Sequence, residues 1–159
     1  MTVSITSGLI DQIVSAAQRS PSAEVCGLLL SSHAGPVPAS ASIEVPTAEN
    51  GPVMPIEAVV ACANVAADPA RRFEIDPAAL LSAHRAARRG GPAVVGHYHS
   101  HPSGDPTPSP RDAADAAADG SIWLIAGSIS GHVEVRGWRA VAQGAVHGRF
   151  DPIALRVTP

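Results

Sequence analysis

The sequence predicts a single α/β (α+β) domain over residues 1–159, built on a mixed, curved β-sheet that about three helices flank. Three observations support this prediction. Helix-like and strand-like segments alternate along the chain, which is typical of domains with a mixed sheet. The length of 159 residues suits one domain with one core. The composition, 45% hydrophobic and 16% charged, is typical of a globular chain, and no linker or repeat divides it.

The helices are predicted by apolar spacing and by residues that begin and end them. Over Ser7–Arg19, apolar residues recur at helical spacing, and either Thr6 or Ser7 can cap the start. The helix over Asp76–Arg89 begins with a capping Asp and a proline, and a pair of glycines follows it. A third helix is expected over Ser109–Ala118, after a loop rich in proline.

The strands are predicted from short apolar runs bounded by turn-forming residues. They are Val25–Leu30, Ser42–Pro46, Ile56–Val65, Arg72–Ile75, Ala93–Ser100, Ile122–Ile129, Val133–Ala142 and roughly Val146–Phe150. The segments His33–Ala39, Thr47–Pro55 and Pro102–Pro108 are predicted to be loops, and Asp68-Pro69 a turn.

Charge and cysteine content exclude several classes of protein. The formal net charge is −3 and no block of Lys and Arg is present, so a nucleic-acid-binding face is not expected. Cys26 and Cys62 match neither a disulfide framework nor a Cys-x-x-Cys zinc pattern. No secretory signal is visible, and no apolar stretch approaches the roughly 20 residues that cross a bilayer. We therefore expect a cytoplasmic protein with no membrane partner.

The segment from His97 to Asp112 is the most informative part of the chain. His97, His99 and His101 alternate along a predicted strand, and side chains two residues apart on a strand face the same way. Two imidazoles can then converge on one metal ion, and the next helix can return Asp112 as an oxygen ligand. Two histidines and one carboxylate leave a tetrahedral zinc ion one open position for water, which is the catalytic arrangement.

The start of the third helix has a second interpretation. Ser109 is a good N-cap, a proline follows it, and Asp112 is an acid in the first turn. Capping and metal binding can hold at once, because Ser109 can cap the helix with its lone pairs while its O–H points elsewhere. Local sequence alone leaves both roles of Asp112 open.

The same residues resemble a known signature. The run from His99 through Ser109 to Asp112 resembles the JAMM motif, His-x-His-x7-Ser-x2-Asp. The segment that begins at Glu24 and ends at Leu30 is similar to the first strand of that family, which carries its catalytic glutamate. The chain thus resembles the JAMM (JAB/MPN-plus) zinc metalloproteases, which implies an MPN/JAMM-type domain.

The resemblance implies a role for each matching residue. His99, His101 and Asp112 would hold Zn²⁺. Glu24 would be the general base that takes a proton from zinc-activated water, and Ser109 would hydrogen-bond the oxyanion. Spacing alone does not select Glu24, because a glutamate before a strand is usually a solvated charge. His97 and Cys26 lie outside the motif.

The patterns around these two residues favour structural roles. His97 is interpreted as a core residue or one that supports the ligands, rather than as a ligand itself. Cys26 follows the proposed base, which leaves a Cys–His nucleophile as an alternative. A thiol before an apolar run is more consistent with a small buried hydrophobe.

The resemblance also implies a substrate. The short bacterial and archaeal branch of the family acts on ubiquitin-like or sulfur-carrier proteins that end in Gly-Gly. Asn64–Pro69 and Arg72–Pro77 are similar to that branch. The third helix leads into a strand within a few residues, which leaves no room for the second insertion of ubiquitin-chain-specific relatives. The expected activity is hydrolysis of a peptide or isopeptide bond after such a tail.

Two other classes of function remain as alternatives. One is a non-catalytic MPN-fold scaffold or binding domain, although such relatives lose a His or the Asp and this chain keeps every motif position. The other is a zinc hydrolase that acts on a substrate other than a peptide. Zinc content separates the first alternative from a peptidase, and a panel of substrates separates the second.

Overall fold

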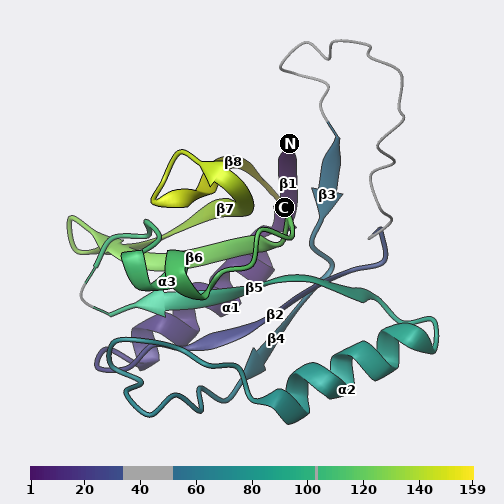
Figure 1. The fold of residues 1–159 in the computed structure, drawn as a ribbon, viewed down its shortest axis with the longest axis horizontal. Coiled ribbons are helices and arrows are strands. Elements are labelled where there is room, and N and C mark those ends of the chain that lie inside the picture. The colour runs from purple at the N-terminus through teal and green to yellow at the C-terminus, as the bar shows by residue number, and fades with distance from the viewer. Residues whose placement is uncertain (34–51, 103) are drawn as a thin grey trace.

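The computed structural model describes residues 1–33, 52–102 and 104–159. Within these residues one sheet of eight strands forms in the order β3-β1-β8-β7-β6-β5-β2-β4, and three helices accompany it (Figure 1). The strands are β1 Thr2–Thr6, β2 Cys26–Ser31, β3 Val53–Pro55, β4 Ala58–Cys62, β5 Ala93–His101, β6 Ile122–Ile129, β7 His132–Gly144 and β8 Gly148–Thr158. The helices are α1 Ser7–Arg19, α2 Pro77–Arg88 and α3 Pro110–Asp115. The predicted fold class is confirmed.

The pairing of the strands is mixed. β5 runs parallel to β6, and β1 runs parallel to both β3 and β8, whereas the other pairs are antiparallel. A parallel pair needs a crossover between its strands, and α3 lies in the crossover from β5 to β6. The carboxyl end of β5 and the start of α3 are therefore neighbours, and both carry motif residues.

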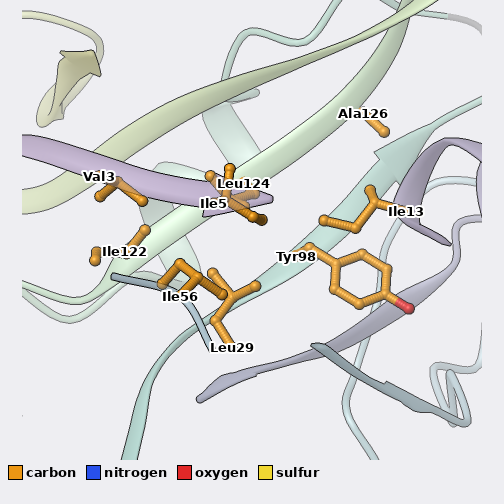
Figure 2. Packing of buried hydrophobic residues seen from close by; sticks show 9 residues of the cluster. All are labelled: Val3, Ile5, Ile13, Leu29, Ile56, Tyr98, Ile122, Leu124 and Ala126. Carbon is orange, nitrogen blue, oxygen red and sulfur yellow. The ribbon is translucent and has the colours of Figure 1, made fainter. Parts of the chain in front are cut away.

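The two faces of the sheet bury different clusters. Along β6, Ile122, Leu124 and Ala126 belong to the core cluster on one face, which packs against residues of α1 (Figure 2). Trp123 and Ile125 belong to the cluster on the opposite face. This alternation follows from the period of two in a strand. The second face is the one that carries the histidines of β5.

The predicted helix starts agree with the structure. Thr6 caps α1 by accepting a hydrogen bond from the N–H of Leu9, and Asp76 caps α2 by accepting from Ala78. A left-handed glycine, Gly90 with φ of 92°, follows α2. The third helix is shorter than the predicted Ser109–Ala118. It ends at Asp115 because Ala116 is extended and buries its side chain in the cluster around Trp123 and Phe150.

Several predicted strand boundaries were wrong. The predicted loop Thr47–Pro55 contains β3, and β1 was not predicted at all. The strand predicted over Ile56–Val65 is confined to β4, and Arg72–Ile75 forms only one bridge, between Ile75 and Asn64. β8 runs to Thr158, eight residues beyond the predicted end at Phe150. The predicted strand Ser42–Pro46 lies outside the described residues.

Candidate metal centre

Two histidines of β5 and one aspartate of α3 meet at one point. The ligand atoms of His99, His101 and Asp112 all lie within 4.8 Å of one another. The Nε2 atoms of the histidines are 3.0 Å apart. His99 Nε2 lies 3.4 Å from Asp112 Oδ1, and His101 Nε2 lies 3.3 Å from Asp112 Oδ2. The structure thus brings together the three side chains that the motif predicted.

A short loop, residues 104–106, orients His101. The Nδ1–H of His101 donates to the carbonyl oxygen of Asp105 at 2.9 Å, so Nε2 is the nitrogen that faces the other two groups. The indole N–H of Trp138 donates to the proline carbonyl of the loop at 2.9 Å. A Cβ at Gly127 would collide with the loop backbone, so only glycine allows this close approach.

The chemistry of the three groups fits a bound cation. His101 Nε2 lies 3.3 Å from the carboxylate of Asp112, so a proton on the imidazole or a metal ion between the two groups satisfies both of them. Although burial alone would raise it, the pKa of Asp112 is lowered by hydrogen bonds from His101 and His99. Burial lowers the pKa of His99, which keeps its ring neutral and available as a ligand.

Ser109 both caps α3 and binds the carboxylate. Its Oγ accepts from the N–H of Asp112 at 3.1 Å and donates to Asp112 Oδ2 at 2.8 Å, while its own N–H donates to the same oxygen at 2.7 Å. The first two-way pair of these bonds, between the Asp112 N–H and Ser109 Oγ and between the Ser109 N–H and Asp112 Oδ2, is a capping box, and the hydroxyl adds a third bond to the carboxylate. The carboxylate is therefore held rigidly at the start of the helix.

The carboxyl of Glu24 is buried beside this cluster. Cys26 pairs with His99 in the antiparallel ladder of β2 and β5, so the residue two before Cys26 lies alongside His101, on the same face. Burial raises the pKa of Glu24 to about 7, the positive charge of His101 lowers it and Asp112 raises it further. Its Oε2 is buried and has no hydrogen-bond partner among the described residues. A carboxyl in this state can exchange a proton near neutral pH.

A protein-family model matches most of the chain. The model of prokaryotic homologs of the JAB domain matches residues 6–141. The chain belongs to this family. A desampylase from Haloferax volcanii is 33% identical to this JAB domain over 118 residues, which cover 74% of this chain and 71% of that protein. The family and this relative confirm the prediction of a JAMM-type peptidase.

For the other relatives of this JAB domain, either the match spans a smaller part of the protein or the sequence identity is lower. A probable TtuB-protein conjugate cleaving protease from Thermus thermophilus is 43% identical over 61 residues, 38% of this chain and 41% of that protein. A solved structure from Desulfitobacterium hafniense has a TM-score of 0.74 at 20% identity and covers 98% of this chain and 92% of that one. A solved structure from Salinibacter ruber has a TM-score of 0.57 at 24% sequence identity and covers 96% of this chain and 91% of that one. The two structures support the fold alone.

Two aromatic rings, Phe73 and Trp123, form a wall beside the cluster of His99, His101 and Asp112. The motif did not predict this aromatic wall. The ring of Phe73 stacks on His99 at a centroid distance of 4.3 Å and an interplanar angle of 18°. Trp123 meets Phe73 edge-on at 6.0 Å. The chain holds only five aromatic residues, and this scarcity was the one sequence signal that could have drawn attention to Phe73. These rings give the candidate metal site an apolar side.

The surroundings of His97 and Cys26 favour structural roles for both residues. His97 contacts Trp123 at a centroid distance of 4.1 Å, burial lowers its pKa to about 3, and it is not among the three grouped ligand residues. Cys26 is 1% exposed, and burial raises the pKa of its thiol to about 12. Since a thiolate is the nucleophilic form, this thiol is unsuited to attack a substrate. In the part of the chain that the structure describes, no helix is long and apolar enough to cross a membrane.

Proposed function

We propose that this JAB domain is a zinc-dependent peptidase or isopeptidase that cuts the amide bond after the Gly-Gly tail of a ubiquitin-like or sulfur-carrier protein. One observation carries the proposal: the buried carboxyl of Glu24, whose Oε2 has no hydrogen-bond partner among the described residues, lies beside a cluster of two histidines and one aspartate that fits a metal ion. A metal site and a proton acceptor together are what amide hydrolysis requires. A scaffold domain needs neither group.

His99, His101 and Asp112 would hold the zinc ion. Two imidazoles and one carboxylate are the ligands of several catalytic zinc sites, and they leave one position open. When bound, zinc would act as a Lewis acid and lower the pKa of water to about 7. The hydrogen bonds that His101 donates to the Asp105 carbonyl and that Ser109 donates to the Asp112 carboxylate would keep the ligands oriented.

Glu24 would move the proton. Its raised pKa of about 7 lets the carboxylate accept a proton from the attacking water and return it to the leaving amine at neutral pH. Oε2 of Glu24 has no hydrogen-bond partner among the described residues, so no existing hydrogen bond has to break before it accepts the proton. The aromatic wall of Phe73 and Trp123 would keep bulk water away from this transfer.

The tail of the substrate would pair with an open backbone edge at Phe73. The residues on either side of Phe73 are held by the opposite segment, through bonds between Asn64 and the Arg72 carbonyl and between Val65 and Glu74. Neither the N–H nor the C=O of Phe73 has a backbone partner within residues 1–33, 52–102 and 104–159. An extended peptide could add to this edge as a strand and lead directly past His99. A Gly-Gly end suits such a crowded approach.

The names of two relatives support the choice of substrate. One is a desampylase and the other a probable TtuB-protein conjugate cleaving protease. Both names describe removal of a protein from a conjugate. The short connection from α3 at Asp115 to β6 at Ile122 is consistent with a small processing enzyme rather than one selective for ubiquitin chains.

A cleavage assay tests this proposal. We expect zinc-loaded protein to release a reporter from a carrier that ends in Gly-Gly, and to cut a carrier with two bulky residues in place of the glycines at least about 10²-fold more slowly. The reason is that a misplaced scissile bond of about 1 Å costs a factor of that size. Equal cutting of both carriers would contradict the tail hypothesis. Protein that takes up zinc but cuts neither carrier would favour a substrate other than a peptide.

A second expected result concerns Ser109. Ser109→Ala should still load with zinc supplied in excess, because the three ligands remain, although loss of the bond to Asp112 should weaken zinc affinity by about 10–100-fold. In the zinc-loaded variant kcat should fall about 10²–10³-fold if the hydroxyl turns to the oxyanion during reaction. Loss of the cap should also cost about 1 kcal/mol of folding stability. Asp76→Ala is the control, since it removes the cap of α2 away from the metal cluster. Unchanged kcat in Ser109→Ala would leave Ser109 as a helix cap that orients Asp112.

A further inference from the structure

Glu24 lies just before β2, so the sheet ladder does not hold its backbone. Its N–H donates to the carbonyl of Pro69 at 2.7 Å, and its C=O accepts from the side-chain amide of Asn64 at 2.9 Å. The next residue, Val25, donates to Ser100 Oγ at 2.9 Å. The main-chain position of Glu24 therefore depends on a side chain from the segment that follows β4.

The same amide holds the segment that carries Phe73. Nδ2 of Asn64 also donates to the carbonyl of Arg72 at 3.1 Å, and Oδ1 accepts from the N–H of Glu74 at 3.0 Å. Phe73 lies between these two bonds, and its ring stacks on His99. One side chain thus connects the backbone that bears the buried carboxyl to the wall that packs on a metal-ligand candidate.

A further bond uses the remaining capacity of this side chain. Oδ1 of Asn64 accepts from the N–H of Ala66 at 3.1 Å, which closes a local turn. Two donated and two accepted bonds are the usual full complement of an amide side chain. An aspartate at this position could accept the same two bonds but donate neither, and its charge would face the carbonyl oxygens of Glu24 and Arg72.

We propose that Asn64 is a positioning residue, which holds Glu24 at the correct place for proton transfer beside the metal cluster. The inference rests on the proposed function, because it takes Glu24 to be the general base. Asn64 does not touch the substrate or the metal ligands; it acts through the carbonyl of Glu24 and the strand edge at Phe73.

Three variants test the proposal in the zinc-loaded full chain, with a Gly-Gly carrier as substrate. Asn64→Ala removes all four bonds, and Asn64→Asp removes the two donated bonds while it keeps the local turn. Val65→Ala is the matched control, since this neighbouring side chain is 47% exposed. We expect kcat to fall about 10²-fold in both Asn64 variants, as for a catalytic group displaced by about 1 Å, with zinc content within a few-fold of wild type. KM should rise as well, because both variants lose the bond to the Arg72 carbonyl that holds the strand edge at Phe73.

Two further measurements separate positioning from a general loss of structure. In the Glu24→Gln background, Asn64→Asp should lower the residual kcat by less than about 3-fold, because its effect passes through the base. Amide hydrogen exchange at Glu24 should quicken in Asn64→Asp without metal, while exchange in α2 stays unchanged.

Some outcomes would overturn the proposal. Unchanged kcat and unchanged exchange at Glu24 would do so, and so would an undiminished effect of Asn64→Asp in the Glu24→Gln background. Loss of zinc along with activity would show that Asn64 supports the ligands instead. If the wild type neither bound zinc nor cut the carrier, the proposed function would fail. The exchange comparison would still decide whether Asn64 holds Glu24.

Discussion

Asp112→Ala should abolish both metal binding and turnover. The carboxylate faces both imidazoles, at 3.4 Å from His99 and 3.3 Å from His101, so its removal leaves a two-ligand site. Loss of a group that only supports a ligand costs 10–100-fold in metal affinity, so loss of the ligand itself should cost at least about 10²-fold. Zinc titration followed by metal analysis of the purified protein measures this.

The control for this variant lies on the same helix. Asp115→Ala removes an exposed carboxylate that pairs with Arg111 on α3, and it should leave zinc affinity and kcat within a factor of two. Zinc retained at wild-type affinity by Asp112→Ala would show that this carboxylate is a capping group only.

The pH dependence of stability offers an independent measurement on Asp112. Its folded-state pKa is lowered by His101 and His99, so the stabilisation is present above the unfolded pKa and is lost as pH falls through the folded value. Metal-free wild type should therefore lose stability progressively below about pH 4, the ordinary aspartate range. Asp112→Ala should lack this part of the acid response in chemical denaturation.

The three candidate metal ligands could be found in the sequence because their grouping depends on local geometry. Alternation places His99 and His101 on one face of β5, and a capping pattern places Asp112 in the first turn of α3. Each of these features depends on fewer than twenty neighbouring residues. The resemblance to the JAMM motif added Glu24, whose burial depends on strands far along the chain.

What the sequence could not provide are contacts between distant segments. β1 forms by pairing with β3 and with the end of β8. The residues near Thr2–Thr6 carry no signal that predicts either partner. Phe73 lies in a segment with one bridge only, and its value lies in its stack on His99, 26 residues later. Asn64 also could not be found from sequence, since three of its four bonds reach Glu24 or the Phe73 segment.

Glu24→Gln should keep the metal and lose turnover. The amide has nearly the shape of the carboxyl, so the packing beside β2 and the three ligand side chains should be unchanged. It cannot accept a proton, and removal of a general base typically costs 10²–10⁴-fold in rate. Parallel measurement of zinc content and of kcat on the Gly-Gly carrier gives the result, with Glu134→Gln as control on the exposed surface of β7.

The same variant makes a prediction for metal-free protein that does not need substrate. Burial raises the folded-state pKa of Glu24 from 4.5 to about 7, so its contribution to stability is fully present below pH 4.5 and is lost as pH rises through 7. Between these values wild type should lose stability relative to Glu24→Gln, because the charged form is buried without a full set of hydrogen bonds. Denaturant unfolding of both proteins at pH 5 and pH 8 measures the difference. An equal gap at the two pH values would place this carboxyl in water, and a carboxyl in water would have no raised pKa with which to serve as the base.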